Sequence, residues 1–592
     1  MLNSPASGLS IGTIPAVTQS SETDSGKTPF GKIGRAALAS ADASADRSHS
    51  EDGPRHTDRP RVLCISYHFP PVGGAGVQRP VKFVKYLREF GWEPTVLAAA
   101  NPSVPVFDAS LLRDLPADLR MVHARTWEPD YRVKQQLGQN QPADSQGATG
   151  TAHRGESSPV PTGRNWKQAL RTALRSIAGL ALQPDAQLLW LPNAFEAAYR
   201  LLQQTPHDLI FATAPPYSNL LLGGLLKQAT GLPLVLDYRD EWDLSSQYLE
   251  NSRRDFWSGF VQERMQRWVL RQADAVIATT QASTRRVAER AHAARRMAWL
   301  TGAKDGGPIL PPLASRCIYN GFDPVDFASP EHLSPATPYT SAAPAAAESR
   351  ESAAGQSAPV PATRDDRLRL VYTGTLWNLT SIAPVVAALE QLSQDAPALA
   401  GQIELIAVGR KTPEQLVIVN RLERTPVRLE RIDYLPHAQA IEWMRSADAL
   451  LLLLSDVPGA DRVAPAKLFE YLALERPILA VLPDGESAQI VRQFDPTGHY
   501  RPDDIAGISR WLRAALQQKL SRVGHQTDLF ESAPVRPSAH AFTRRELTRQ
   551  LANLFDELTP GRPVASAGSQ PPASQSPAAE LDSRTTDRGE SC

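Results

Sequence analysis

A short segment late in the sequence combines a proline, a lysine and a glutamate in a pattern that could bind a phosphorylated nucleoside. Pro465 suits the first turn of a helix, where its missing N–H group costs nothing. Lys467 and Glu470 then lie three residues apart on one face of that helix. The helix N-terminus and Lys467 could hold a pyrophosphate, and the Glu470 carboxylate could accept hydrogen bonds from two vicinal ribose hydroxyls. An ordinary surface salt bridge between the two side chains is the alternative.

A glycine-rich loop early in the chain is the second candidate for binding phosphate. Gly73, Gly74 and Gly76 follow a short apolar run, and glycine lets the backbone N–H groups at a helix N-terminus approach an anion closely. Arg79 could add positive charge there, or it could simply be solvated on the first helical turn. A tight turn between strand and helix would need the same glycines. A nicotinamide cofactor is disfavoured, because the second strand ends at Asn101 without the acidic residue that such sites place there.

Acidic and aromatic side chains gather at the end of another apolar run, in the sequence LDYRDEW from Leu236 to Trp242. Asp237 and Asp240 would lie at the carboxyl edge of a strand. Such a cluster could bind sugar hydroxyls or position an acceptor. The alternative is an internal arginine–aspartate pair that fixes the loop.

Two more strand ends would face the same place as Lys467. Gly374 and Thr375 follow one apolar run, and Arg410 follows the next. In doubly wound sheets, ligands bind beyond the carboxyl ends of the strands. We therefore expect these three residues to contribute to the same binding site.

The elements that must position these residues are strands and helices that alternate in two blocks. Buried strands are expected at 61–66, 94–100, 209–213, 232–237 and 275–279, and again at 369–373, 403–408, 449–454 and 478–482. Helical patterns separate them. The predicted fold class is α/β, with two doubly wound, Rossmann-like parallel-sheet domains at 59–315 and 316–540 and a last helix at 541–559.

Four segments rich in Ala, Pro, Ser, Thr and Gly interrupt or flank these blocks. They are the tails 1–58 and 560–592 and the insertions at about 138–163 and about 328–365. Such segments bury too little apolar surface to offset chain entropy, so they are predicted to be disordered.

The overall composition excludes several classes of protein. The chain has 63 basic and 63 acidic residues, so no net field favours nucleic acid. Its three cysteines show no paired motif, which indicates neither a disulfide framework nor a zinc site and fits a reducing cytoplasm. Neither an apolar leader nor a run of about 18 apolar residues is present, so an export signal and a membrane span are not expected.

Over roughly residues 60–556, the sequence resembles family 4 of the glycosyltransferases, in the GT-B superfamily. The matching motifs are FPPVGGAGVQR from Phe69, LDYRDEW from Leu236, IYNGFDPVDF from Ile318, YTGTLW from Tyr372 and PAKLFEYLALERPILA from Pro465. The resemblance implies two domains facing a central cleft. It also implies a nucleotide sugar bound chiefly by the second domain and an acceptor bound chiefly by the first.

The resemblance also suggests roles for individual residues. Glu470 would match the second glutamate of the family's E-x7-E motif, which holds the nucleotide ribose. Arg462 stands where the first glutamate is expected, and Asp461 is the nearest acid for contact with the sugar. Arg410 and Lys467 are the candidates for neutralising the leaving diphosphate.

Two acids, Asp240 and Asp461, are the candidate catalytic residues, and no general base is assigned. The sequence has no Asp-X-Asp motif, so the mechanism is expected to be independent of metal and cofactor. The predicted function is a retaining, hexosyltransferase-like enzyme of polysaccharide or cell-envelope biosynthesis. It would transfer a sugar from a nucleotide-diphosphate sugar to a glycan, lipid-linked or small-molecule acceptor. A sugar-nucleotide epimerase and a catalytically silent sugar-nucleotide-binding protein are the alternatives.

A basic amphipathic helix is predicted between residues 164 and 181. Arg164, Lys167, Arg171 and Arg175 recur at helical spacing with apolar residues between them. This helix could lie on an anionic membrane beside a lipid-linked acceptor, or it could pack on the first domain with a solvated basic face. The expected location is the cytoplasm, with peripheral contact to the inner face of the plasma membrane as one possibility.

Overall fold

Thirteen strands fall into two separate parallel sheets in the computed structural model, which describes residues 59–104, 107–128, 183–244, 256–302, 312–328, 367–524 and 539–560. The predicted disordered tails and insertions lie outside these ranges, except for Ala328 and Pro560 at their edges. The predicted amphipathic helix at 164–181 also lies outside them.

The first domain is built on a seven-stranded sheet with the order β3-β2-β1-β4-β5-β6-β7, in which all neighbours are parallel. The order reverses between β1 and β4, as in a doubly wound fold. The strands are β1 (Arg61–Ile65), β2 (Glu93–Ala99), β3 (Arg120–Ala124), β4 (Leu209–Ala214), β5 (Leu234–Tyr238), β6 (Ala275–Ala278) and β7 (Ala314–Cys317).

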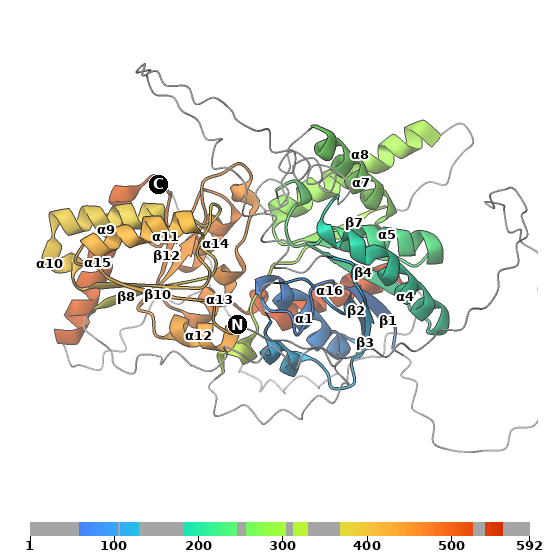
Figure 1. The fold of residues 1–592 in the computed structure, drawn as a ribbon, viewed down its shortest axis with the longest axis horizontal. Coiled ribbons are helices and arrows are strands. Elements are labelled where there is room, and N and C mark those ends of the chain that lie inside the picture. The colour runs from blue at the N-terminus through green and yellow to red at the C-terminus, as the bar shows by residue number, and fades with distance from the viewer. Residues whose placement is uncertain are drawn as a thin grey trace, which may run out of the picture. The chain divides into compact units, whose positions relative to one another are not determined.

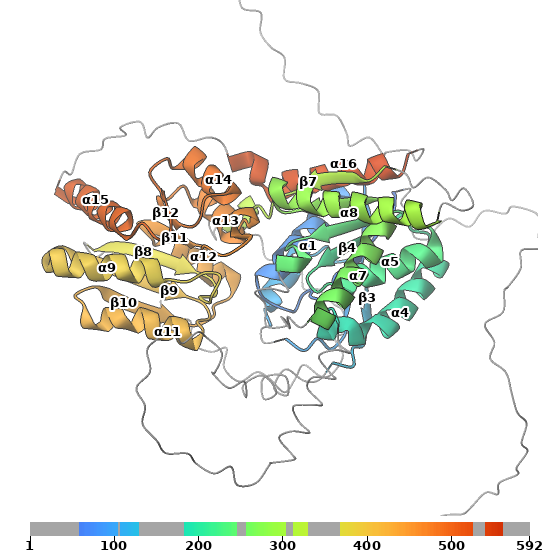
Figure 2. The same ribbon diagram turned by 90° about the horizontal axis from the view of Figure 1, so that it is seen from above.

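Helices cover both faces of this sheet (Figure 1, Figure 2). They are α1 (Ala75–Leu87), α4 (Leu191–Gln204), α5 (Ser218–Thr230), α7 (Phe256–Gln272) and α8 (Gln281–Gly302). Val62 and Cys64 of β1 pack with α1 on one face, whereas Leu63 and Ile65 pack with α4 and α5 on the other. This alternation explains why β1 reads as an unbroken apolar run.

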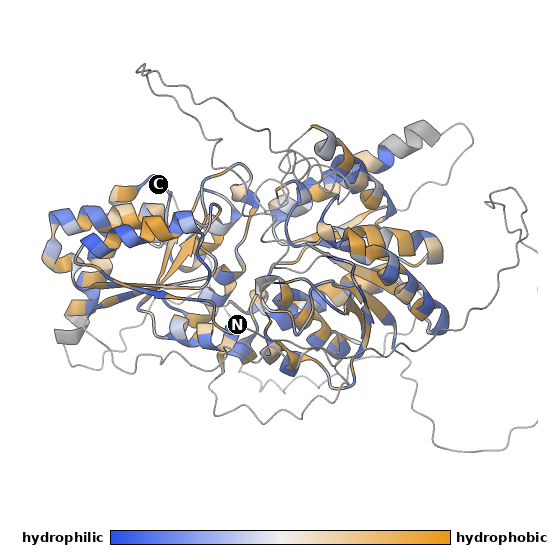
Figure 3. Cartoon of the chain, viewed as in Figure 1, coloured by the Kyte–Doolittle hydropathy of each residue, from blue (hydrophilic) through white to orange (hydrophobic). Residues whose placement is uncertain are grey.

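The second domain repeats the plan with a six-stranded parallel sheet of order β10-β9-β8-β11-β12-β13. Its strands are β8 (Leu368–Thr373), β9 (Ile403–Val408), β10 (Arg428–Ile432), β11 (Ala449–Leu453), β12 (Ile478–Val481) and β13 (His499–Tyr500). Its helices are α9 (Ala383–Asp395), α10 (Pro397–Ala400), α11 (Pro413–Val419), α12 (His437–Arg445), α13 (Ala466–Leu474), α14 (Glu486–Phe494) and α15 (Ile505–Gly524). Figure 3 shows hydrophobic residues, in orange, concentrated between sheet and helices in each domain.

These two parallel sheets confirm the predicted fold class. Both belong to one compact unit, Asp58–Cys592, so the predicted domain limits stay predictions. Within the described ranges, none of the helices combines the length and the apolar character that a membrane span requires.

The last helix, α16 (Arg544–Leu558), returns to the first domain. It lies against α1 (Figure 1), and Leu547, Leu551 and Phe555 are part of the apolar cluster beneath α1. The Phe322 amide donates to the Phe542 carbonyl at 3.0 Å, so the chain segments leading into and out of the second domain are paired where they cross.

We expect Phe555→Ala to lower the free energy of unfolding by about 3–5 kcal/mol, because removal of the ring leaves a cavity in the hydrophobic core. The Phe555 ring is fully buried and meets the Trp92 ring edge-on, with 5.1 Å between the ring centroids. Chemical denaturation measures the change. Glu557→Ala on the same helix is the control, since among the described residues Glu557 forms a single, exposed ion pair, with Arg316. Equal stability of the two variants would contradict the packing of α16.

Candidate functional site

Two adjoining cavities lie at the carboxyl ends of the strands. The first, of about 260 Å³, is lined by Glu470, and we call it the Glu470 cavity. The second, of about 450 Å³, is lined by Trp242, and we call it the Trp242 cavity. Both include residues from each domain, and they share Ala466, the first residue of α13.

The structure brings seven of the predicted binding residues together in the Glu470 cavity. They are Gly73, Gly74, Gly374, Thr375, Arg410, Lys467 and Glu470. Gly76, Arg79 and Asp240 line the Trp242 cavity instead. Asp461 lines neither of the two.

Glu470 is held by two donors on one side of the Glu470 cavity. His437 Nε2 lies 3.1 Å from one carboxylate oxygen, and Lys467 Nζ donates to the other at 2.8 Å. Burial alone would raise the pKa of this carboxyl, but the Lys467 ammonium and the His437 ring outweigh it and hold the pKa well below its usual range. The carboxylate is therefore ionised, and each oxygen keeps a lone pair for a ligand hydroxyl.

The start of α13 is open to an anion. Its N-cap is Pro465, whose side chain makes no capping hydrogen bond. The N-cap side chain thus supplies no acceptor for the first N–H groups of this helix, which carry the positive end of the helix dipole. Ala466 and Lys467 place this end in the wall of the Glu470 cavity.

Two glycines let the ends of β8 and β9 touch. Gly374 has φ of 143° and Gly409 has φ of 117°, both in the region that side chains rarely adopt. A Cβ atom on Gly409 would lie 2.1 Å from the Gly374 carbonyl oxygen. This contact brings the backbone of both strand ends, with Thr375 and the exposed Arg410, to the cavity wall.

The glycine loop forms the opposite wall, which belongs to the first domain. Gly74 has φ of 105°, and a Cβ atom built there would meet nothing within 4 Å. Gly76 is closer packed, because its Cβ would lie 3.0 Å from the Arg239 guanidinium. The loop thus passes from the Glu470 cavity to the Trp242 cavity as the chain enters α1.

Arg79 has a different environment from the one expected for a phosphate-binding residue. Its side chain is buried and forms a two-pronged ion pair with Asp237, with an Nη2 to Oδ1 distance of 2.9 Å. It also donates to the carbonyl oxygens of Ile318 and Tyr319. The alternative that Arg79 is solvated on the first helical turn is wrong, because its side chain is buried. Its contact with a phosphate stays a prediction, and in this structure Arg79 positions the loop.

Asp240 faces the Trp242 cavity from the loop after β5. The residue is exposed to solvent, yet the protein atoms around its carboxyl partly desolvate it and raise its pKa; the Arg239 guanidinium opposes the shift, and Asp237 and Glu241 add to it. The Trp242 ring stacks on Tyr217 behind it, with 4.6 Å between centroids. A carboxyl with a raised pKa in a cavity is typical of an acid or base that takes part in chemistry.

A buried carboxyl in the Trp242 cavity, Asp185, was missed by sequence reasoning. Asp185 accepts from the backbone N–H of Tyr217 at 2.6 Å and of Ser218 at 3.1 Å, and thereby caps α5. Burial raises its pKa to about 6, although the hydrogen bonds from Ser218 and Tyr217 oppose the shift. No local spacing reveals this cap, because Asp185 lies more than thirty residues before the helix that it stabilises.

The predicted sugar-contacting position is instead part of a contact between the domains. Arg462 forms a two-pronged ion pair with Glu241 of the first domain, at 2.8 and 3.1 Å. Its carbonyl oxygen accepts from the Thr280 hydroxyl at 2.8 Å. Asp461 is exposed, and its carboxylate lies 3.7 Å from the Arg462 guanidinium.

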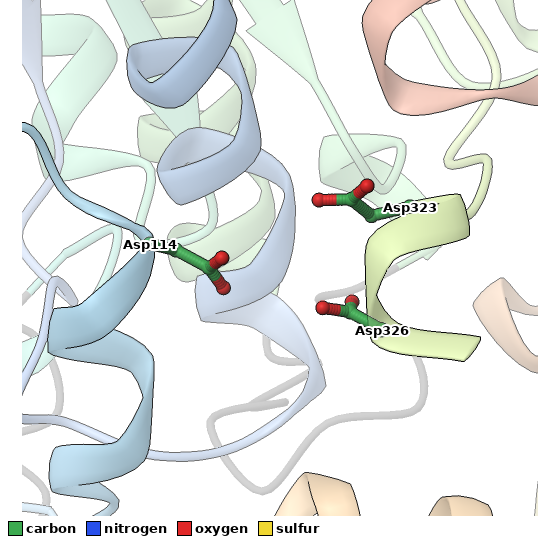
Figure 4. Close-up of side chains that lie close together, drawn as sticks. All are labelled: Asp114, Asp323 and Asp326. Carbon is green, nitrogen blue, oxygen red and sulfur yellow. The ribbon is translucent and has the colours of Figure 1, made fainter. Parts of the chain in front are cut away.

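Three carboxylates close to one another could hold a metal ion by geometry alone. Asp114, Asp323 and Asp326 face one another around α1 (Figure 4). However, Lys82 Nζ donates to all three at 2.7–2.8 Å, and Lys85 donates to two of them. The three carboxylates thus pair with two ammonium groups. This cluster is a salt-bridge network that joins α1 to Asp114 and to residues 318–328, the linker that leads into the second domain.

Most of the first domain matches the model of a known protein family. Residues 73–300 match the model of the glycosyl transferase 4-like domain. This segment is similar to a glycosyl transferase 4-like domain. It includes most of the glycine loop and all of β4 to β6, so most of the first-domain residues that line the two cavities belong to it. The match confirms the resemblance to GT-B glycosyltransferases.

Solved structures resemble the whole chain at low identity. A sucrose-phosphate synthase from Thermosynechococcus elongatus is 14% identical, with a TM-score of 0.44 over 84% of this chain and 99% of that chain. A UDP-forming trehalose-phosphate synthase from Burkholderia xenovorans is 13% identical, with a TM-score of 0.45 and coverages of 86% and 100%. A putative UDP-N-acetylglucosamine 2-epimerase from Listeria monocytogenes is 11% identical, with a TM-score of 0.41 and coverages of 85% and 98%.

No curated protein sequence matches the chain. The three solved structures carry different activities in their descriptions, so a likeness at this level does not select one activity. The proposed function below therefore rests on the match of residues 73–300 to the glycosyl transferase 4-like domain and on the geometry of the two cavities.

Proposed function

We propose that the protein transfers a sugar from a nucleotide-diphosphate sugar to a hydroxyl of a glycan, lipid-linked or small-molecule acceptor, with retention of configuration. The observation that carries this proposal is the Glu470 cavity. Lys467, Glu470 and the open start of α13 converge there with the glycine loop of the other domain. Such a set suits a ribose joined to a diphosphate.

The sugar and the acceptor are assigned to the neighbouring Trp242 cavity. The two cavities meet at Ala466, so a diphosphate at the start of α13 would present its sugar between them. Positive charge for the leaving diphosphate would come from the helix N-terminus, Lys467 and Arg410, without a metal ion. Asp240 would bind and orient the acceptor hydroxyl.

One observation favours a second candidate, a binding protein without turnover. Arg462 occupies the position of the first motif glutamate and is engaged with Glu241. A protein lacking that sugar contact could bind the nucleotide sugar and not transfer it.

Incubation with a panel of UDP-, GDP- and ADP-sugars separates the candidates. We expect one donor to bind and to be consumed, by slow hydrolysis alone and by transfer once an acceptor hydroxyl is supplied. Chromatography of the products and NMR of the anomeric proton report turnover and stereochemistry. Binding without turnover would support the silent protein, and release of an epimerised sugar nucleotide would support an epimerase.

We expect Glu470→Gln to weaken binding of the matching nucleoside diphosphate by about 10- to 100-fold, since it removes charge-assisted hydrogen bonds to the ribose. The 2′,3′-dideoxy analogue isolates this effect. Wild-type protein should prefer the ribose form, and the variant should bind both forms alike. Calorimetric titration measures the affinities, with Glu442→Gln on the exposed side of α12 as control. A ribose preference that survives Glu470→Gln would remove Glu470 from the ribose site.

Replacement of Asp240 by Asn should lower kcat/KM for the acceptor by about 100-fold and leave donor affinity close to that of the wild type. The ionised Asp240 carboxylate accepts a stronger, charge-assisted hydrogen bond from the hydroxyl than the neutral carboxyl does. The pKa of Asp240 is raised, so wild-type activity should fall with decreasing pH at a higher pH than an ordinary aspartate would give. This acidic limb should be missing in the variant.

The same substitution at Asp461 tests the other candidate acid. Its carboxylate is exposed and outside both cavities, so we expect a pH profile like that of the wild type. A larger loss from Asp461→Asn than from Asp240→Asn would reverse the assignment.

A further inference from the structure

An arginine from the far end of the chain lies in the wall of the Glu470 cavity. Arg544 is the first residue of α16, and it lines the cavity together with Lys467 and Glu470. Its side chain is only 4% exposed. Among the described residues, no hydrogen-bond acceptor lies within reach of its Nη1 atom.

The carboxylates near Arg544 do not accept a hydrogen bond from its Nη1 atom. Burial lowers the pKa of its guanidinium to about 9; Arg79 adds to the shift, while Glu470, Asp326 and Asp323 oppose it. These three carboxylates already accept hydrogen bonds from other donors. Glu470 is held by Lys467 and His437, and both aspartates are held by Lys82.

A buried guanidinium nitrogen without an acceptor is costly, because its desolvation is not compensated. An anion bound in the cavity would remove that cost. The planar guanidinium presents two parallel N–H donors, which match the oxygen spacing of a phosphate better than the ammonium of a lysine does.

The backbone fixes Arg544 firmly at this point. Its amide donates to the Phe322 carbonyl at 2.7 Å, at the crossing of the two interdomain segments. The preceding Thr543 caps the helix by accepting from the Glu546 amide at 3.4 Å. The guanidinium is therefore placed by the first domain, through α16, while it lines a cavity shared with the second domain.

We propose that Arg544 binds the diphosphate group of the nucleotide sugar, opposite the start of α13. This inference rests on the proposed function and adds to it a cation that comes from the first domain's side of the cleft. The diphosphate then contacts both domains, through Lys467 on one side and Arg544 on the other.

The test compares a nucleoside diphosphate with its monophosphate in each variant. UDP with UMP, GDP with GMP and ADP with AMP serve as probes in calorimetric titrations. In Arg544→Gln, the preference of the protein for the diphosphate over the monophosphate should fall by about 10- to 100-fold. Arg544→Lys keeps the charge but not the paired donors, and its preference should fall by about 3- to 10-fold.

Arg545→Gln is the matched control, because this neighbour on α16 is exposed and pairs only with Glu89 among the described acids. Its diphosphate preference should equal that of the wild type. The preference is a ratio within one protein, so partial unfolding does not change it, and thermal melting shows whether each variant folds. If Arg544→Gln does not fold, Arg544→Lys decides.

The outcomes separate the two proposals. A folded Arg544 variant that keeps the wild-type diphosphate preference, or that loses diphosphate and monophosphate equally, overturns the role of Arg544. Failure of the wild-type protein to bind any of the three diphosphates overturns the proposed function itself.

Discussion

The buried guanidinium of Arg79 connects three segments that lie far apart in the sequence. It joins α1, which follows the glycine loop, to Asp237 at the end of β5 and to the carbonyl oxygens of Ile318 and Tyr319 in the linker. A buried ion pair is stable only when all of its partners are present, and removal of one partner typically costs about 3–5 kcal/mol. One side chain therefore fixes the relative positions of three segments: the glycine loop, the end of β5 just before Asp240, and the entry to the second domain.

A second set of contacts joins the domains beside α13. Arg462 pairs with Glu241, and Glu486 of α14 accepts from the backbone N–H groups of Gln281 and Ala282 at the start of α8. The Glu486 carboxylate thus satisfies two N–H groups that the helix itself cannot pair. Arg462, at the position where the resemblance leads us to expect a glutamate, thus holds the first domain through its ion pair with Glu241.

Sequence patterns predicted the strands that are buried on both faces, such as β1 and β9, because their apolar runs are continuous. They did not predict the four edge strands, which contain polar or charged residues among the apolar ones: β3, β7, β10 and β13. The same logic applies to the site. Lys467 and Glu470 are neighbours on one helix, so their spacing is visible in the sequence, whereas Arg544 reaches the same cavity from a helix more than seventy residues later.

Polar partners are the hardest part to predict, because their pairing depends on the tertiary fold. The sequence around Arg79 is compatible with a phosphate ligand, and only the tertiary fold puts Asp237 beside its guanidinium. Asp185 likewise has no local sequence pattern that marks it as the cap of α5. Charge and sequence motifs limited the number of candidate binding residues. The packing of the two domains determines which of these residues line a cavity and which are engaged in internal ion pairs.

The return of α16 to the first domain has a consequence for synthesis of the chain. Leu547, Leu551 and Phe555 fill the apolar face that α1 and its sheet present, and they are translated after all of the second domain. Until those residues leave the ribosome, the first domain has an uncovered hydrophobic surface, and the second domain must fold next to it. A transiently exposed hydrophobic surface of this kind makes a folding chain prone to aggregation.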